Sequence, residues 1–264
     1  HRDVSVPFSY LDDNQKPVGF AMDLCARIVD AVKGELKLPA LQTRLQPIQL
    51  STQIPLIENG TIDIVCGPAT NTLERQKVVA FSDTIFVSSI RAVVRKDAPI
   101  RAFEDLGGRP VSLTSGSTSI GLLSARAQAN NFQTKNILTP DHAASFLALT
   151  TGRSEAFVMD DILLASLVAG SKSPDDYVIS KDAFSKPEPY GIMLRKDDAP
   201  FKKVVDAATA ALYTSGEGQK IYDKWFTQKI PPKGLNLNSP AGPEMKKQFA
   251  KPSDSPDPDA YLVN

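Results

Sequence analysis

The sequence predicts an α/β fold built from two α/β units. Stretches with the spacing of amphipathic helices alternate along the chain with short apolar stretches of strand character. This alternation is typical of a mainly parallel sheet covered by helices. The chain has 264 residues, of which 42% are hydrophobic, so it can form the cores of two ordinary domains. The sequence has no internal repeat of solenoid length.

The first unit is predicted from the apolar pattern of residues 19–32. Its apolar side chains recur at helical spacing, so we expect an amphipathic helix that ends near Gly34. Three further elements are expected in chain order: a strand-like stretch at 43–48, a short helix at 52–59 and a strand at 62–66.

The second unit is predicted to contain a strand, a loop and a helix in direct succession. The strand covers residues 110–113, a loop of small residues covers 114–119 and the helix covers 120–129. Such an arrangement directs backbone N–H groups to a helix N-terminus, where an anion can bind. The elements expected to follow are helices at 143–151 and 162–169, a strand between them at 156–159 and a strand at 190–195.

The last part of the chain is predicted to be a long helix followed by a tail. The helix covers residues 200–226 and is interrupted near 215–216. Beyond residue 230, prolines and polar residues dominate. We therefore expect an extended tail that lies on the surface or is disordered.

The charges of the chain balance, which argues against several classes of partner. Its 30 lysines and arginines equal its 30 aspartates and glutamates, so no net field attracts a nucleic-acid backbone or an anionic membrane. No apolar run approaches the roughly 20 residues that span a bilayer. No basic, apolar leader precedes His1, so we expect an export signal to have been removed.

Two cysteines, Cys25 and Cys66, are too few for the common zinc sites. The sequence leaves open whether they are two buried thiols or one disulfide. We expect no metal and no other cofactor.

Three segments, read together, carry a resemblance to a known family. They are HRDVSVPFSYLDDNQKPVGFAMDL at 1–24, NGTIDIVCGPATNTLERQKVVAFSDTIF at 59–86 and SGEGQKIYDKWF at 215–226. The segments TSGSTS, FVMDD and YGIMLRKDD fit in the same order, so the resemblance covers nearly the whole chain. The chain resembles the periplasmic amino-acid-binding proteins of ABC importers, and most closely their glutamate/aspartate-binding subgroup.

The resemblance implies a two-lobed fold of the type II periplasmic-binding-protein (Venus-flytrap) kind, with two hinge crossings. The implied parts are lobe one at 1–88 plus 193–264, lobe two at 89–192, an extended tail on lobe one at 231–264, and hinge crossings near 87–92 and 190–194. The family has a short apolar strand ahead of the position of His1, so we expect residues upstream of the chain shown.

Two residues of the segment 59–86 predict a carboxylate-binding site from their side chains and position alone. Thr70 and Arg75 follow a buried strand across a short loop. A hydroxyl and a forked guanidinium can therefore converge on one carboxylate at the carboxyl end of that strand. The alternative is that Arg75 forms a surface ion pair with Glu74 or Asp83.

The resemblance also implies how a zwitterionic amino acid is held. Arg75 and Thr70 hold its α-carboxylate, with help from Thr118, Ser117 and the backbone of the 114–119 loop in the opposite lobe. Asp160 receives the α-ammonium group.

Two further positions match those that face the side-chain carboxylate of the ligand in the acidic subgroup. They are Arg2 and His142. The alternatives are a solvated arginine near the chain end and a histidine that caps or packs a helix.

The sequence departs from the subgroup at three positions of the implied pocket. Leu50 and Gln53 stand where the subgroup has a serine and an arginine, and Pro68 stands where it has a serine. A missing arginine contact to a carboxylate costs on the order of tenfold to a thousandfold in affinity. Glutamate or aspartate is the expected ligand, and glutamine, asparagine or another small carboxylate stays open.

The implied function is that of an extracytoplasmic, periplasmic solute-binding protein. It captures a free amino acid by hinge closure and delivers it to the permease subunits of an ABC transporter. We expect a monomer that catalyses no reaction. One rival is a prephenate-type dehydratase on the same fold, with His142 or Asp160 as general acid. The other rival is the sensor domain of a longer receptor.

Overall fold

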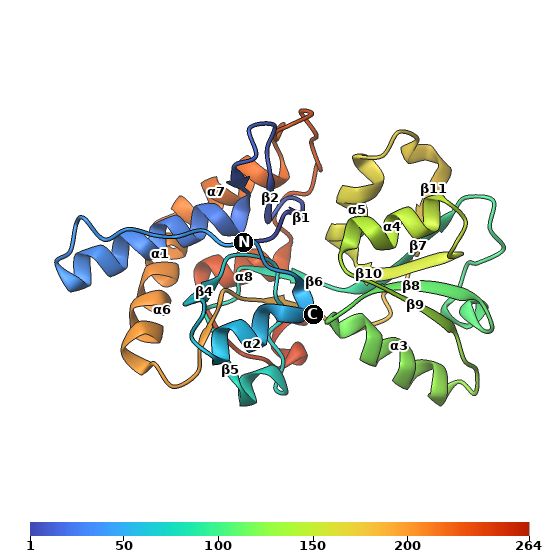
Figure 1. Ribbon diagram of the computed structural model, residues 1–264, viewed down its shortest axis with the longest axis horizontal. Coiled ribbons are helices and arrows are strands. Elements are labelled where there is room, and N and C mark those ends of the chain that lie inside the picture. The colour runs from blue at the N-terminus through green and yellow to red at the C-terminus, as the bar shows by residue number, and fades with distance from the viewer. Residues whose placement is uncertain (264) are drawn as a thin grey trace. The chain divides into compact units, whose positions relative to one another are not determined.

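The computed structural model describes residues 1–263, and the chain divides into two compact α/β units (Figure 1). Unit 1 consists of His1–Ile48, Thr52–Val87 and the chain from Pro187 onward. Unit 2 consists of Gln49–Ser51 and Ser88–Lys186. The sequence-based expectation of two units that combine helices and sheets is confirmed.

Unit 2 contains a five-stranded mixed sheet. Its strands, in spatial order, are β11 (Tyr177–Ile179), β7 (Ile90–Arg95), β10 (Ala156–Asp160), β8 (Pro110–Thr114) and β9 (Lys135–Thr139). β8 pairs in parallel with β9 and β10, whereas β7 pairs antiparallel with β10 and β11. The expected mainly parallel sheet is therefore wrong for this unit, because β7 and β11 add antiparallel pairing on one side of a parallel core.

The helices of unit 2 follow the strands closely. They are α3 (Thr118–Ala129), α4 (His142–Thr150), α5 (Asp161–Ala169) and the 3₁₀ helices η3 (Phe103–Leu106) and η4 (Pro174–Asp176). All five residues of β10 are buried, as expected for a central strand with both faces covered. α4 begins at an N-cap aspartate, because the Asp141 carboxylate accepts a hydrogen bond from the Ala144 N–H at 2.8 Å.

Unit 1 contains short strands in three small sheets. The first sheet contains β1 (Val4–Ser5), β2 (Ser9–Leu11) and β3 (Pro17–Val18), and the second contains β4 (Ile64–Val65), β13 (Met193–Arg195) and β5 (Val79–Phe81). The third pairs β12 (Glu188–Tyr190) with β6 (Phe86–Ser88, whose last residue falls in unit 2). The second sheet is antiparallel throughout. The single strand expected at 190–195 is thus two strands that pair in different sheets.

One expected strand of unit 1 is absent. Residues 43–48 form no regular secondary structure. Their backbone hydrogen bonds go to the first residue, because His1 N donates to Gln46 O at 2.9 Å and Ile48 N donates to His1 O at 2.9 Å. Two such bonds to a single residue do not make a ladder.

The helices of unit 1 lie mainly at its two chain ends. They are α1 (Phe20–Leu36), α2 (Gln53–Glu58), α6 (Ala199–Thr214), α7 (Glu217–Phe226) and α8 (Pro243–Ala250), with the 3₁₀ helices η1 (Leu50–Thr52, whose first two residues fall in unit 2), η2 (Arg75–Lys77) and η5 (Pro258–Tyr261). α1 continues past Gly34 to a left-handed Lys37. Within residues 1–263, no helix combines the length and the apolar character that a bilayer crossing requires.

The predicted extended tail contains two helical segments. α8 and η5 both begin with a proline in their first turn, where its missing N–H breaks no helical hydrogen bond. The prolines that predicted an extended chain therefore start helices here. Met245 is 3% exposed and Tyr261 is 1% exposed, so the tail packs onto unit 1. Asn264 lies outside the described residues.

A glycine places the N-terminal hairpin of unit 1 against its aromatic core. Gly19 has a φ of 137°, and a Cβ there would lie 2.3 Å from Phe8 O, so only glycine fits. Phe8 packs edge-to-face on Phe86 and Phe226, with ring centroids 5.1 and 5.5 Å apart. This packing holds the segment that carries Arg2.

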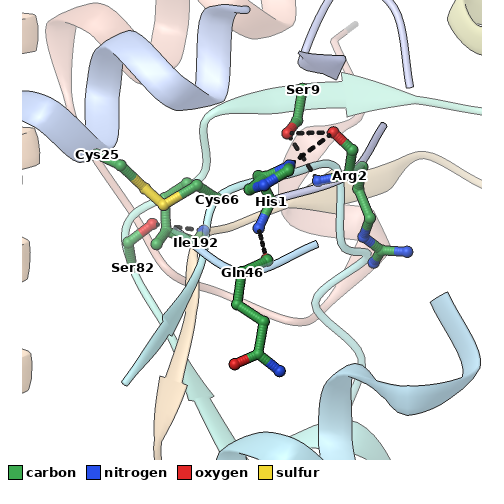
Figure 2. The surroundings of a disulfide bond; sticks show 8 residues. All are labelled: His1, Arg2, Ser9, Cys25, Gln46, Cys66, Ser82 and Ile192. Carbon is green, nitrogen blue, oxygen red and sulfur yellow. Dashed lines mark hydrogen bonds between the residues drawn. A yellow bond between two sulfur atoms is a disulfide. The ribbon is translucent and has the colours of Figure 1, made fainter. Parts of the chain in front are cut away.

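Cys25 and Cys66 form a disulfide (Figure 2), which answers the question that the sequence left open. Cys25 lies in α1 and Cys66 follows β4, with Cα atoms 6.0 Å apart. The bond ties the start of the 66–76 loop to α1. Figure 2 also shows His1 and Arg2 in the neighbouring segment.

We predict that the disulfide contributes substantially to the stability of unit 1. The two cysteines are separated by 41 residues in the sequence, and closing a loop of this length stabilises the folded state by about 4 kcal/mol in the chain-entropy model. Replacing both (Cys25→Ser with Cys66→Ser) should lower the free energy of unfolding measured by denaturant titration. Reductant should lower that of the wild type equally, and a double variant as stable as oxidised wild type would contradict the prediction.

Candidate ligand-binding site

Arg2 is a buried cation of unit 1. The residue is only 4% exposed, and its guanidinium Nη2 donates a hydrogen bond to Gln53 Oε1. Its backbone N–H donates to Ser9 Oγ at 2.9 Å. A Cβ on Gly67 would lie 3.1 Å from Arg2 Cγ, so the glycine leaves room for the arginine stem. The alternative of a solvated chain-end arginine is wrong.

The charge of Arg2 is compensated by no carboxylate within residues 1–263. Burial lowers the pKa of Arg2 to about 9, and the nearby positive charge of Arg75 lowers this pKa as well. At neutral pH the guanidinium is still charged. Arg2 Nε and Gln53 Nε2 are buried and have no hydrogen-bond partner among the described residues. These N–H groups and this charge suit an anion that accepts hydrogen bonds.

Thr70 lies between β4 and η2, and Arg75 is the first residue of η2, so both belong to the 66–76 loop of unit 1. Arg75 Nη1 donates to Thr70 O at 2.8 Å, and Arg75 N donates to Thr72 Oγ1 at 3.1 Å. The proposed ion-pair partners of Arg75 are engaged elsewhere, because Glu74 pairs with Lys77 and Asp83 accepts a hydrogen bond from Thr209.

The hydroxyl of Thr70 has a partner that sequence reasoning missed. Thr70 Oγ1 donates its single proton to Glu188 Oε2 at 2.9 Å. In this arrangement the oxygen presents lone pairs to any further partner, so it can accept from an ammonium group. Glu188 lies in β12, just ahead of the segment that carried the resemblance, and no spacing linked it to Thr70.

In unit 2 the candidate residues gather at one edge of the sheet. β8, β9 and β10 are parallel and end at Thr114, Thr139 and Asp160. The helices α3, α4 and α5 begin directly after these ends or within a few residues. The carboxyl edge of parallel strands with helix N-termini around it is the usual ligand position in α/β sheets.

Asp160 is the last residue of β10 and the N-cap of α5, and it is 3% exposed. The following Asp161 serves another role, since its carboxylate accepts from Ser88 Oγ at 2.7 Å and from Ser89 Oγ at 3.0 Å. Asp161 therefore stabilises the chain where it enters unit 2.

His142 opens α4 and is 4% exposed. Its Nδ1 lies 2.9 Å from Thr114 Oγ1, which in turn lies 3.1 Å from Ser145 Oγ. The side chain that caps α4 is Asp141. The alternative of a helix-cap histidine is therefore wrong, and the ring is oriented by hydroxyl groups of the same sheet edge.

The loop after β8 leads into a helix, as predicted, but α3 begins at Thr118, two residues earlier than expected. Ser117 is the N-cap residue and Thr118 the first residue of this 12-residue helix. Ser117 Oγ is buried without a hydrogen-bond partner among the described residues. The loop thus brings a hydroxyl and helix N–H groups to the same edge as Asp160.

The three departures from the subgroup also lie in defined places. Gln53 is 1% exposed and contacts Arg2, where an arginine would add a second buried cation. Pro68 is buried in the loop between Gly67 and Ala69, and Leu50 is 9% exposed in η1. The ligand-binding roles of all these residues stay predictions.

The solved structures that this chain resembles define its class. An ancestral arginine-binding protein bound to arginine matches with a TM-score of 0.76 and 30% identity, over 85% of this chain and 96% of that chain. Holo ArgBP from T. maritima matches with a TM-score of 0.70 and 29% identity, over 84% of this chain and 92% of that chain. The fold is that of the type II periplasmic binding proteins, as the resemblance implied.

The family follows from the sequence. Residues 2–228 match the bacterial extracellular solute-binding proteins, family 3, and the chain belongs to this family. An L-glutamate/L-aspartate-binding protein from Pseudomonas aeruginosa is 50% identical over 255 residues, which are 96% of this chain and 84% of that protein. A glutamate/aspartate import solute-binding protein from Escherichia coli K12 is 47% identical over 254 residues, with the same coverage. The resemblance is confirmed.

We predict that the Arg2–Gln53 pair lowers the stability of the ligand-free protein. Replacing both with apolar residues (Arg2→Met with Gln53→Leu) removes an uncompensated buried charge and two unpaired N–H groups, which stabilises by roughly 1 kcal/mol or more. The thermal midpoint should rise by roughly 2–4 °C. Gln53→Leu alone is the control and should lower the midpoint, because it leaves Arg2 with less hydrogen bonding. A double variant that melts at or below the wild-type midpoint would refute the prediction.

Proposed function

We propose that this protein binds glutamate or aspartate outside the cytoplasmic membrane and delivers it to the permease of an ABC importer. The observation that carries the proposal is the buried charge of Arg2, which no carboxylate within residues 1–263 compensates. The names of the two relatives point to the same ligands. A ligand with a second carboxylate supplies the negatively charged partner that Arg2 lacks among residues 1–263.

In this proposal each charged group of the amino acid has its own partners. Arg75 binds the α-carboxylate, and Thr118 with Ser117 adds donors from the N-terminus of α3. The α-ammonium group is bound by Asp160 and by the oxygen of Thr70, whose proton is committed to Glu188. The side-chain carboxylate is bound by Arg2 and His142.

The proposed partners come from both units, so a bound ligand would stabilise a closed form of the protein. Arg2, Thr70 and Arg75 belong to unit 1, and Asp160 with His142 belongs to unit 2. A ligand that interacts with both sets shifts the population toward a closed form by its differential affinity. The permease would recognise this closed form.

The proposal is one of binding without catalysis by a monomer in the periplasm. A dehydratase would need a general acid aimed at a leaving group. The two candidates have other assignments here, since Asp160 binds an ammonium group and the Nδ1 of His142 interacts with Thr114. Membership of an extracellular solute-binding family supports the binding function.

Arg75→Ala should lower the affinity for glutamate by at least about thirtyfold, because the α-carboxylate loses its charged partner. Isothermal titration calorimetry measures this change. Arg27→Ala is the matched control, since Arg27 is an exposed arginine of unit 1 that pairs with Glu217. Near-normal affinity in Arg75→Ala would remove Arg75 from the site.

A ligand panel tests the side-chain assignment separately. Glutamate and aspartate should bind more tightly than glutamine and asparagine in the wild type, since only the acids neutralise Arg2. In Arg2→Met this preference should shrink by roughly tenfold or more. A wild-type preference for a neutral amino acid would show that Arg2 and His142 do not bind a carboxylate.

A further inference from the structure

The C-terminal tail contacts the loop that carries Thr70 and Arg75. We call residues 253–261 the strap. The strap lies beyond residues 2–228, the part of the chain that matches the family model, and it belongs to unit 1 together with the loop. Its contacts with the loop therefore do not depend on how the two units are placed.

Tyr261 anchors the strap. The residue is 1% exposed, and its hydroxyl lies 2.7 Å from Thr84 Oγ1 and donates to Ser255 O at 2.7 Å. Backbone pairing adds to this anchor, because Thr84 N donates to Ser253 O at 2.8 Å. A buried aromatic ring with a satisfied hydroxyl holds its segment firmly.

Asn71 joins the strap to both ends of the binding loop. Its Nδ2 donates to Asp254 O at 2.9 Å, and its Oδ1 accepts from Gln76 Nε2 at 2.9 Å. Its backbone N–H donates to Pro189 O at 2.7 Å. Asn71 is 1% exposed. It follows Thr70 directly and Gln76 follows Arg75, so one buried amide restrains the two proposed ligand-binding residues.

An ion pair adds a second, weaker link between the strap and unit 1. Lys202 Nζ lies 2.8 Å from Asp254 Oδ2 and 2.6 Å from Asp206 Oδ2. Asp83 is a third carboxylate near this lysine. Burial and the charges of Asp206 and Asp254 raise the pKa of Asp83 to about 6. The Asp254 side chain is 47% exposed, and exposed pairs contribute little. The buried contacts of Asn71 and Tyr261 therefore dominate.

The loop needs an external restraint. Between β4 and η2 its backbone forms no strand and one isolated β-bridge, between Thr70 and Tyr190, so no continuous ladder of backbone hydrogen bonds holds it. A loop that must be ordered when the ligand binds reduces the affinity by the entropy lost. The strap supplies order before the ligand arrives.

We propose that the strap is a positioning element of the ligand site, which acts through Asn71 to hold Thr70 and Arg75 in their binding arrangement. The proposal rests on the proposed function, because it assumes that these two residues contact the α-amino and α-carboxylate groups. Asn71 and Tyr261 are positioning residues that do not touch the ligand themselves.

The test uses Tyr261→Phe in the full-length protein, with Tyr10→Phe as matched control. Both tyrosines are buried in unit 1, and the Tyr10 hydroxyl donates to Pro231 O at 2.7 Å, which is neither in the loop nor in the strap. Asn71→Asp is the second variant, since it keeps the acceptor for Gln76 and loses the donor to Asp254. Hydrogen exchange of the ligand-free proteins and calorimetry with glutamate, aspartate and glutamine are the two readouts.

The expected result is faster exchange at residues 70–78 in Tyr261→Phe and Asn71→Asp but not in Tyr10→Phe. All three ligands should lose affinity by the same factor, about threefold to thirtyfold, because the strap acts on groups that every amino acid shares. Combining Tyr261→Phe with Arg75→Lys should give a smaller loss than the two single losses predict.

Unchanged exchange at residues 70–78, or faster exchange with unchanged affinity, would overturn the strap proposal. Additive losses with Arg75→Lys would also overturn it. Failure of the proposed function is a different result, since it appears as normal glutamate binding by Arg75→Ala while the exchange measurement, made without ligand, still reports on the strap.

Discussion

The buried guanidinium of Arg2 is the constraint on which the proposed ligand site depends. Taking a cation out of water without a carboxylate partner is unfavourable, yet the fold of unit 1 imposes it. Gly19 allows the N-terminal hairpin to pack closely on the aromatic core, and Gly67 leaves space for the aliphatic part of the Arg2 side chain. The ligand-free protein therefore carries an electrostatic cost, which the proposed anionic ligand would offset.

The loop of residues 66–76 shows how an irregular segment is held without a strand ladder. The disulfide at Cys66 ties its start to α1, Glu188 accepts from Thr70, and the carbonyl of Asp254 accepts from Asn71. These restraints come from three distant parts of the chain. Together they hold the guanidinium of Arg75 and the hydroxyl oxygen of Thr70 in defined positions, although the loop contains no strand.

Much of the fold was predictable because its signals are local. Helical periodicity located α1, α3, α4, α5 and the pair α6 and α7 within a few residues, and the strand–loop–helix at 110–129 located one edge of the candidate site. Non-local features misled the sequence reasoning. The stretch 43–48 has strand character, but its backbone pairs with the single residue His1 and forms no strand. The prolines of the tail begin helices instead of preventing them.

The sequence by itself determined the fold class, the family and the identity of the candidate residues, since these depend on side-chain spacing and on segments that can be compared. Only the tertiary structure decided that Cys25 and Cys66 are bonded and that Arg2 is buried without a carboxylate partner among residues 1–263. It also decided the direction of the Thr70 hydroxyl, because Glu188 lies 118 residues further along the chain. Burial, charge compensation and hydrogen-bond partners depend on which distant segments meet, and no local pattern encodes that.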